Sequence, residues 1–232
     1  MAATKHTDGL IDRLPLVSGR YEAFADLGSR SWFRTGGAAE VLFEPADAND
    51  LQTFMEGRPC DAAITIVGFG SNLLVRDSGV DGVVIRLGEA FARIEFDGDK
   101  ITAGASALDV NVARAAQVKG IAGMEFLSGI PGTIGGAARM NAGAYGSEFA
   151  DVVLDATVID ESGGTHVLNS SQLEFSYRRS SLPEGWVVIS ARLKGEPGST
   201  EEIARRMAKI ASARTESQPR TRTGGSTFAN PP

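Results

Sequence analysis

Two spacings of apolar residues alternate in the early part of the chain. Short continuous apolar runs bounded by glycine or proline are typical of buried strands. Leu51, Phe54 and Met55 instead recur at helical spacing, ahead of Gly57, which suits a helix end. The pattern predicts, in order, a strand at 39–45, a helix at 48–57, and strands at 64–68 and 83–88. Strand and helix alternate here, which indicates an α/β unit.

The segment from 92 to 104, ARIEFDGDKITAG, alternates apolar and polar residues on either side of Asp97-Gly98, which predicts a β-hairpin. A helix is expected next, because Ser106 and Asp109 have the spacing of a capping box and Gly120 provides an end. Its expected apolar stripe consists of Leu108, Val112, Ala115 and Ala116.

Three later runs, VVLDATVID, GTHVLN and WVVISARLKG, predict a set of antiparallel strands. Ser199 and Glu202 then have capping spacing at the start of a last helix. We expect the buried face of that helix to carry Ile203, Met207 and Ile210, and its exposed face Arg205, Arg206 and Lys209.

Composition places the chain among globular proteins. Its 232 residues are 42% hydrophobic and 22% charged, which suits one large or two ordinary domains. The single cysteine, Cys60, excludes an internal disulfide, and His6 and His166 do not have the spacing of a zinc site. The sequence has no signal-peptide pattern and no apolar stretch long enough for a membrane span. We therefore expect a cytoplasmic protein without a structural metal.

The net charge of −6 argues against a nucleic-acid-binding protein. The charge is uneven, because basic residues outnumber acidic ones after residue 200. This basic end either binds a phosphate-bearing small molecule or is simply a solvated helix face.

Two glycine-rich segments are the strongest indication of a site. The first runs from Gly68 to Asn72 after a predicted strand, and its glycines would let backbone N–H groups converge on an anion, although a plain tight turn has the same pattern. It is not a Rossmann fingerprint, because Leu73 occupies the third glycine position. The second, from Ser128 to Gly146, is too apolar for a solvent linker and too glycine-rich for a helix. We expect its backbone to wrap around a large ligand; the alternative is a buried crossover.

Six motifs occur in order along most of the chain: RTGG (34–37), VGFGSNLLV (67–75), LSGIPGTIGGA (127–137), NAGAYGSE (141–148), FSYRRS (175–180) and GGSTFANP (224–231). Together they resemble the motifs of the UDP-N-acetylenolpyruvoylglucosamine reductases. The resemblance implies an α+β protein with the vanillyl-alcohol-oxidase or PCMH-type FAD-binding fold, in which two α/β subdomains precede a substrate-binding domain.

The resemblance also implies a domain division. Residues 1–20 would be a lead-in, 21–88 and 89–217 the two FAD-binding subdomains, and 218–232 the beginning of the substrate-binding domain. The short connection SSLPEG after Arg178 resembles the subtype without an inserted substrate loop. The family's substrate domain continues further and supplies a catalytic glutamate that no residue here matches, so we expect a truncated chain that binds FAD but is inactive.

The cofactor site follows from the same motifs. The FAD diphosphate is expected on Gly68, Gly70, Ser71 and Asn72. The rest of the flavin is expected on Ile130, Pro131, Gly132, Asn141, Ala142, Gly143, Ala144, Tyr145 and Gly146. Attachment is expected to be non-covalent, because neither a histidine nor the cysteine lies in a motif that would bear it.

The implied reaction is the NADPH-dependent reduction of UDP-N-acetylglucosamine enolpyruvate to UDP-N-acetylmuramate, a step in peptidoglycan synthesis. Hydride reaches the β-carbon of the enolpyruvyl group through the flavin, and the enolate that results must be stabilised. Arg178 is suited to this role, since its guanidinium is permanently cationic and presents a planar fork to a carboxylate. The alternative for Arg178 is a surface ion pair.

Three further residues take implied roles in this reaction. Ser226 would donate the proton to the α-carbon, because a neutral hydroxyl can protonate a basic enolate. Tyr177 and Asn230 would contact the substrate, and Ala229 departs from the lysine common in the family at that position.

Two other functions stay open: another flavin oxidoreductase on the same fold, such as an alcohol or sugar oxidase, and a non-catalytic flavin- or nucleotide-binding module. The motifs YRRS and GGSTFANP argue against the first. We expect a monomer with no nucleic-acid or membrane partner.

Overall fold

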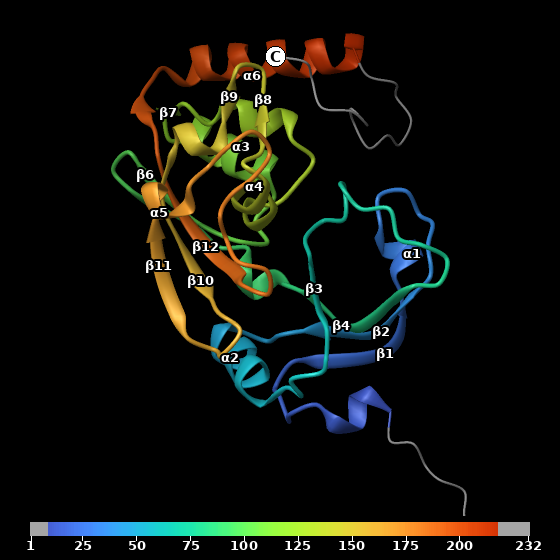
Figure 1. Cartoon of the computed structure of the whole chain (residues 1–232). Helices are drawn as coiled ribbons and strands as arrows, with labels where there is room; N and C mark the ends of the chain where they lie inside the picture. Colours follow the sequence, from blue (N-terminus) through green and yellow to red (C-terminus); the bar gives the residue numbers. More distant parts are fainter. Residues whose placement is uncertain (1–8, 218–232) are drawn as a thin grey trace, which may run out of the picture.

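The computed structural model describes residues 9–217 of the chain. Two larger β-sheets and their helices form most of the described part of the molecule (Figure 1). In the view of Figure 1 the first sheet lies at the lower right, the second at the left, and helix α6 (Thr200–Ser217) runs along the top. Within the described residues, no helix is long and apolar enough to cross a membrane.

The first sheet contains the three strands that the apolar runs predicted and a fourth, β1, that the sequence analysis did not predict. Its members, in the order β1-β2-β4-β3, are β1 (Arg20–Asp26), β2 (Ala38–Glu44), β4 (Val80–Arg86) and β3 (Ile64–Val67). Strand β1 is antiparallel to β2, and β2, β4 and β3 are parallel. Parallel neighbours require crossover connections. Helix α2 (Ala48–Gly57) provides one of them, and the first glycine segment lies in the next, between β3 and β4.

Helix α2 forms where its apolar spacing predicted a helix. The Asp47 side chain caps it by accepting from the N–H of Asp50 at 2.9 Å. Leu51, Phe54 and Met55 are buried against the first sheet. The short elements of this part are η1 (Leu10–Arg13), α1 (Leu27–Arg30) and η2 (Glu89–Phe91).

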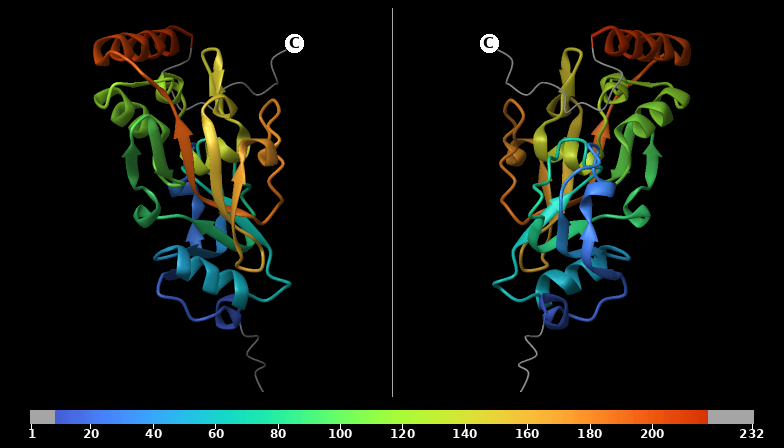
Figure 2. Two further views of the ribbon diagram at one scale, coloured as in Figure 1. Left: turned by 90° about the vertical axis from the view of Figure 1, so that its left-hand side faces the viewer. Right: turned by 90° about the vertical axis from the view of Figure 1, so that its right-hand side faces the viewer.

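The second sheet is entirely antiparallel, as the sequence predicted. Its strands follow the order β11-β10-β12-β6-β5: β11 (Thr165–Asn169), β10 (Val153–Ile159), β12 (Val187–Lys194), β6 (Lys100–Gly104) and β5 (Ile94–Asp97). Helices α3 (Asp109–Val118) and α4 (Ile134–Met140) share its hydrophobic core. Helix α6 packs on α3 and on η3 (Glu125–Gly129), so it closes this half from above (Figure 2).

The remaining short elements complete the second half. They are β7 (Ile121–Ala122), which pairs with β13 (Glu196–Pro197), the hairpin of β8 (Gly143–Ala144) and β9 (Ser147–Glu148), η4 (Phe149–Asp151), and α5 (Ser170–Leu173). The two halves share buried surface, because Ile159 of β10 and Val187 of β12 pack in one cluster with Phe43 and Phe54 of the first half.

The predicted capping box at the start of α3 is wrong. The Ser106 hydroxyl donates to the carbonyl of Gly88 at 2.6 Å, and Leu108, which has no side-chain cap, occupies the N-cap position. The Asp109 side chain is buried instead of returning to the backbone. At the start of α6 the hydrogen bond expected from the Ser199 cap is present, since the Glu202 N–H donates to the Ser199 hydroxyl at 3.4 Å.

The expectation that the second glycine segment is too glycine-rich for a helix is also wrong. Ile134–Met140 forms α4, which includes Gly135 and Gly136. A Cβ on Gly135 would lie 3.0 Å from that of Ala105, so glycine lets this helix approach the end of β6 closely. Tertiary packing therefore outweighs the low helix propensity of the two glycines.

Candidate functional site

The first glycine segment follows β3 at the carboxyl end of the parallel strands, where loops of α/β sheets commonly bind ligands. None of the backbone N–H groups from Phe69 to Asn72 hydrogen-bonds to another described residue. Gly70 has a φ of +76°, a left-handed conformation that glycine adopts without strain. Its carbonyl accepts from the N–H of Trp32 at 3.3 Å, which holds the loop against the segment after α1. The loop thus presents unused N–H donors on a fixed backbone.

The RTGG motif supports this loop from behind. The N–H of Gly37 donates to the carbonyl of Arg76 at 2.9 Å. A Cβ on Gly36 would lie 2.5 Å from the Cβ of Val75, and one on Gly37 would lie 2.3 Å from the carbonyl oxygen of Asp77. Both glycines are therefore required by close packing between two backbones, not by contact with a ligand.

The two glycine segments meet in space. A Cβ on Gly68, at the end of β3, would lie 2.8 Å from the hydroxyl oxygen of Thr133, at the N-cap of α4. The loop Ile130–Gly132, which precedes Thr133, therefore belongs to the same surface as the first loop. Residues from the two halves of the molecule that are far apart in sequence form one site.

Asp109 lies directly behind the loop Ile130–Gly132. Its N–H donates to the carbonyl of Gly132 at 3.1 Å, and a Cβ on Gly132 would lie 2.7 Å from one oxygen of its carboxyl group. Gly132 is therefore glycine because the Asp109 carboxyl occupies the space of a side chain.

Among residues 9–217 the Asp109 carboxyl has no hydrogen-bond partner on either oxygen, and it is fully buried. Burial raises its pKa to about 8. A helix N-terminus favours a negative charge by only about 0.3–1 kcal/mol, which does not offset the burial of an unpaired carboxylate. The carboxyl group is therefore protonated at neutral pH.

The buried Asn141 joins the second glycine segment to the YRRS motif. Its side-chain N–H donates to the carbonyl of Ser176 at 3.1 Å, and its side-chain oxygen accepts from the N–H of Ala150 at 3.0 Å. Asn141 has a φ of +42° at the C-cap of α4, a position that asparagine tolerates better than most residues. Its side chain therefore connects the second glycine segment to the YRRS turn, and its role toward a ligand stays a prediction.

Arg178 lies in the tight turn that Ser176 and Arg179 close with two backbone hydrogen bonds. Its guanidinium donates to the carbonyl of Gly143 at 2.7 Å and, at 3.4 Å, to that of Asn141. It also lies 5.2 Å from the centre of the Tyr177 ring. Among the described residues Arg178 pairs with no carboxylate, which argues against the surface ion pair. Its positive charge is therefore held in place and left unneutralised.

Three exposed aromatic side chains belong to the same segments. Phe69 is 41% exposed, Tyr145 45% and Tyr177 56%. The Tyr145-Gly146 turn joins β8 to β9, and both residues have positive φ. Phe69 belongs to the loop with the unused N–H donors, and Tyr145 and Tyr177 belong to the second glycine segment and the YRRS turn. Exposed rings and free N–H donors suit a ligand with both an aromatic and an anionic part.

Helix α6 holds η3 beneath the loop Ile130–Gly132. Arg206 binds the nearly buried carboxylate of Glu125 at 2.7 Å, and that carboxylate also accepts from the N–H of Gly123. Arg214 donates to the carbonyl of Gly129, the last residue of η3. These contacts fix the backbone on which the loop begins.

Gly68, Gly70, Ser71 and Asn72 lie in one loop. A second region consists of the residues from Ile130 to Gly132 and from Asn141 to Gly146, and it meets the first loop where Thr133 approaches Gly68. Arg178 and Tyr177 lie against the second region. Ser226, Ala229 and Asn230 lie outside the described residues. Sequence reasoning missed Asp109, Thr133 and the Glu125–Arg206 pair, because nothing in a single sequence distinguishes them from helix-start, turn and surface residues.

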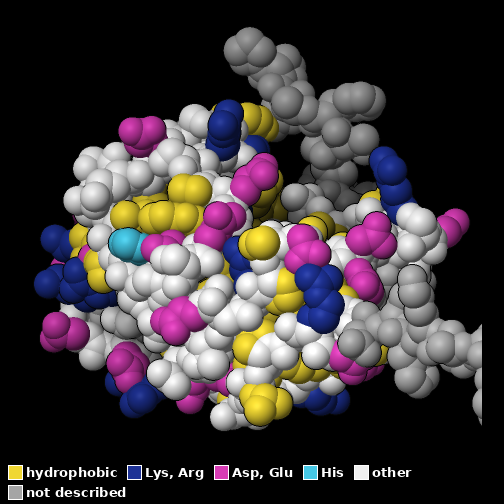
Figure 3. Space-filling model, turned by 60° about the horizontal axis from the view of Figure 1, so that its bottom comes forward, with side chains coloured by type: hydrophobic (Ala, Val, Ile, Leu, Met, Phe, Trp, Pro, Cys, Tyr) yellow, Lys and Arg dark blue, Asp and Glu magenta, His cyan; other side chains and the backbone are white. Residues whose placement is uncertain are grey.

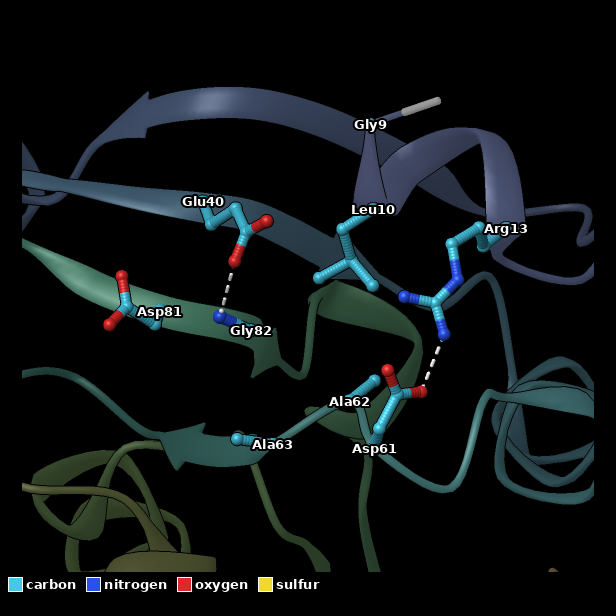
Figure 4. Close-up of a pocket in the computed structure, with 9 residues that line it drawn as sticks. All are labelled: Gly9, Leu10, Arg13, Glu40, Asp61, Ala62, Ala63, Asp81 and Gly82. Atoms are coloured by element: carbon cyan, nitrogen blue, oxygen red, sulfur yellow. Dashed lines mark hydrogen bonds and ion pairs between the residues drawn. The ribbon is translucent and has the colours of Figure 1, made fainter. Parts of the chain in front are cut away.

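A polar pocket of about 430 Å³ lies elsewhere, at the bottom of the first half (Figure 4). The Glu40 carboxylate accepts from the N–H of Gly82, and Arg13 pairs with Asp61. Acidic and basic side chains are interspersed over this face (Figure 3). Since Arg13, Glu40 and Asp61 already have partners and no motif residue lines the pocket, it is not the candidate site.

The site fits a dinucleotide flavin. The unused N–H groups of Phe69 to Asn72 suit a diphosphate, and the exposed rings suit an isoalloxazine. A family profile described as "FAD binding domain" matches residues 39–169, which include both glycine segments.

Known proteins resemble the whole chain. UDP-N-acetylenolpyruvoylglucosamine reductase of Paramagnetospirillum magneticum is 56% identical and that of Parvibaculum lavamentivorans 54%; each alignment covers 100% of this chain and 75% of the relative. The crystal structure of UDP-N-acetylenolpyruvylglucosamine reductase from Thermus caldophilus matches with a TM-score of 0.80 at 35% identity, over 93% of this chain and 76% of that one.

A more distant likeness concerns the fold alone. 6-Hydroxy-D-nicotine oxidase from Arthrobacter nicotinovorans superposes with a TM-score of 0.60 at 19% identity. The predicted α+β fold of the PCMH type is thus confirmed. With relatives of this identity aligned over its full length and an FAD-binding profile that matches more than half of it, the chain belongs to the UDP-N-acetylenolpyruvoylglucosamine reductase family.

Proposed function

We propose that this chain binds FAD non-covalently and that, when extended to the length of its relatives, it uses NADPH to reduce UDP-N-acetylglucosamine enolpyruvate to UDP-N-acetylmuramate, a reaction of peptidoglycan synthesis. One observation carries the proposal. The Arg178 guanidinium is held by two backbone carbonyls next to the second glycine segment and is neutralised by no described carboxylate. A positive charge fixed in this way suits an anion that forms during a reaction.

The residues that would hold FAD come from both halves. The N–H groups of the loop Gly68–Asn72 would bind the diphosphate, which supports roles for Gly70, Ser71 and Asn72. The loop Ile130–Gly132 and the segment from Asn141 to Gly146 would line the rest of the cofactor. Non-covalent binding agrees with the position of Cys60, which lies outside both glycine segments, and with the bond from His166 to Asp160.

When bound, FAD supplies the hydride-transfer chemistry between NADPH and the enolpyruvyl group. The Arg178 guanidinium would bind the carboxylate of the substrate and stabilise the negative charge that develops beside it. A donor of this kind contributes on the order of 10²- to 10³-fold in rate. Tyr177, exposed beside Arg178, would contact the substrate.

Two further roles concern residues outside the described part of the chain. The Ser226 hydroxyl would donate the proton to the α-carbon, since a hydroxyl is protonated near pH 7 without any adjustment of its pKa. Asn230 would contact the diphosphate of the substrate.

The test follows the flavin absorbance of FAD-loaded protein in which this chain is extended to the length of its relatives, first with NADPH and then with the enolpyruvyl substrate, without oxygen. We expect bleaching on NADPH and recovery on substrate. Arg178→Ala should leave bleaching nearly intact and slow recovery about 10²-fold or more, because the stabilised charge exists only in the second step.

The neighbouring residue provides a matched control. Arg179→Ala removes an equally exposed arginine whose backbone closes the same turn, and both steps should stay near wild type. Bleaching without recovery in the extended wild-type protein would contradict the reductase and favour a flavin-binding module. Equal slowing of both steps by Arg178→Ala would mean that Arg178 supports the fold or the flavin.

The remaining proposals concern organisation. We propose FAD-binding subdomains at 21–88 and 89–217, a lead-in at 1–20, a substrate-binding domain that begins at 218–232, and a monomeric protein that acts in the cytoplasm. Each half has its own sheet, which supports the boundary after the first sheet. Sedimentation equilibrium of the FAD-loaded chain tests the monomer, and a mass twice that of one chain would contradict it.

A further inference from the structure

The Asp109 carboxyl is a buried ionisable group without an assigned role. The carboxyl group is fully buried, both of its oxygens lack a partner, and it lies against the backbone of Gly132. The Asp109 N–H donates to the Gly132 carbonyl at 3.1 Å, and the neighbouring residues Leu108 and Thr133 form a β-bridge. Asp109 therefore contacts the loop Ile130–Gly132 on the side of the loop that faces the protein core.

In the described part of the chain, no charged side chain compensates the Asp109 carboxyl. The charged groups on α3 and on the elements around it have other partners or lie in solvent. Glu125 and Arg206 pair with each other, and Lys119 lies over the Phe96 ring. Arg139 donates to the carbonyls of Leu182 and Pro183, and Arg214 donates to that of Gly129. The others are exposed: Arg114, Glu201, Glu202, Arg205, Lys209 and Glu216. Strand β7 and the loop Ile130–Gly132 carry no charge. Burial alone decides the protonation of this group.

We propose that Asp109 is a positioning residue for the flavin: its neutral carboxyl supports the loop Ile130–Gly132 from behind, and its ionisation displaces that loop and weakens FAD binding. The inference rests on the proposed FAD site. Since protein atoms alone bury the carboxyl completely, it acts on a ligand through Gly132 and not by contact.

The physical cause is the cost of a buried charge. A neutral carboxyl fits the space behind Gly132, whereas a carboxylate without partners must gain water or N–H donors. Gly132 and Thr133 supply the backbone N–H groups next to the carboxyl. If either N–H turns toward the carboxylate to donate a hydrogen bond, the loop moves. Pro131 and the α4 helix on either side restrict how far the loop can move without losing its shape.

The experiment measures the dissociation constant of FAD, by quenching of flavin fluorescence, between pH 6 and pH 9. In the wild-type chain the constant should be level below about pH 8, the pKa of the carboxyl, and rise about tenfold for each pH unit above it. Asp109→Asn keeps the size and the neutral charge. It should bind FAD within about threefold of wild type at pH 7, with no such rise.

A buried aspartate far from the loop serves as the control. Asp155 on β10 is bound by Arg192, so Asp155→Asn should keep the wild-type pH profile of FAD binding even if its stability changes. A stability role alone would change the melting temperature of Asp109→Asn without removing the pH dependence of binding.

A second measurement needs no variant. The infrared spectrum of the wild-type chain at pH 7 should contain the carbonyl band of a protonated carboxylic acid, and the band should disappear above pH 8. A pH-independent affinity in wild type, an unchanged profile in Asp109→Asn, or the absence of this band would each overturn the inference. A wild-type chain that binds no FAD at any pH would instead overturn the proposed function.

Discussion

Two buried polar residues of the site differ in how their side chains are satisfied. Asn141 uses its side chain to bind Ser176 and Ala150, whereas the Asp109 carboxyl has no partner. Both are completely buried. A satisfied buried amide stabilises a fold, and an unsatisfied buried carboxyl destabilises it once it ionises. The same degree of burial therefore has opposite effects on stability at these two positions.

Replacement of Asn141 should be costly. Asn141→Ala leaves the Ser176 carbonyl and the Ala150 N–H without partners and puts alanine in a left-handed conformation, so we expect a loss of about 2–4 kcal/mol in the free energy of unfolding by urea. Asn141→Gly loses the same hydrogen bonds but avoids the backbone strain and should cost about 1 kcal/mol less. A cost below about 1 kcal/mol for the alanine variant would show that this connection does not hold the YRRS turn.

Asp109→Asn should instead raise the free energy of unfolding, by an amount that depends on pH. Below the unfolded pKa of 3.8 both states hold the proton, so the two chains differ least. Between 3.8 and about 8 only the folded state holds it, and wild type loses about 1.4 kcal/mol relative to the variant for each pH unit. Above about 8 both states are ionised and the difference stays constant.

Urea unfolding at a series of pH values measures this difference. Asp97→Asn, in the exposed turn of the β5–β6 hairpin, is the control and should show no such trend. A gap between wild type and Asp109→Asn that stays level from pH 4 to pH 8 would mean that the carboxyl is ionised in the folded protein.

Sequence alone predicted residue types better than residue environments. Arg178 is predicted at the site from its motif, because a cation in a motif can be recognised by its chemistry, and its guanidinium lies against Asn141 and Gly143 of the second glycine segment. Asp109 was interpreted as half of a capping pair, since a Ser-x-x-Asp spacing at a helix start is ordinarily a cap. Burial by Gly132, over twenty residues later in the sequence, is not visible in a local pattern.

At the scale of elements, α6 and η3 depend on one asymmetric ion pair. The Glu125 side chain is 10% exposed and that of Arg206 is 51% exposed. Removal of the arginine leaves a nearly buried carboxylate with one N–H donor, that of Gly123, whereas removal of the carboxylate leaves a guanidinium that can turn to water. Removing the arginine and removing the carboxylate should therefore lower the free energy of unfolding by different amounts.

Arg206→Ala should reduce the free energy of unfolding by about 1–3 kcal/mol, and Glu125→Gln by less. Arg205, the adjacent exposed arginine, has only a 3.8 Å contact with Glu202, so Arg205→Ala should cost at most about 0.5 kcal/mol. Urea titration of the three variants tests the order. A larger cost for Glu125→Gln than for Arg206→Ala would show that the burial of the carboxylate does not control this contact.

Elements with a clear period were predictable, and the glycine-rich one was not. Helix α2 follows from the spacing of Leu51, Phe54 and Met55, and the antiparallel sheet from its alternating runs. Helix α4 contradicts the local propensity of Gly135 and Gly136, because small residues allow it to pack closely at Ala105. A sequence read in isolation counts the cost of the glycines but not the packing that they permit.

At the scale of the whole molecule, the site depends on how the two halves meet. Ile159 and Val187 of the second sheet are buried with Phe43 and Phe54 of the first half, and Gln52 of α2 donates to the carbonyl of Gly163 at 3.0 Å. This shared core sets the distance between the two glycine segments. The order of motifs indicated which residues gather, but the closeness of Gly68 to Thr133 depends on the packed sheets.

Gly68→Ala tests that closeness directly. The new Cβ would lie 2.8 Å from the Thr133 hydroxyl oxygen, so the two loops must separate by some tenths of an ångström. No positive φ is recorded at Gly68, so the backbone itself accepts alanine. We expect FAD to bind about tenfold more weakly, equivalent to about 1.4 kcal/mol, with little change in the free energy of unfolding.

The double variant Gly68→Ala with Thr133→Ala removes the oxygen that the new methyl group meets, and FAD affinity should return to within about threefold of that of Thr133→Ala alone. Gly88→Ala is the matched control, because no atom lies within 4 Å of its added Cβ and its φ is −89°. Fluorescence titration with FAD measures all four chains. Wild-type FAD affinity in Gly68→Ala, or an FAD affinity that is not restored in the double variant, would contradict this prediction. Either result would mean that FAD binding does not depend on the contact between Gly68 and Thr133, and that the shared core alone fixes the site.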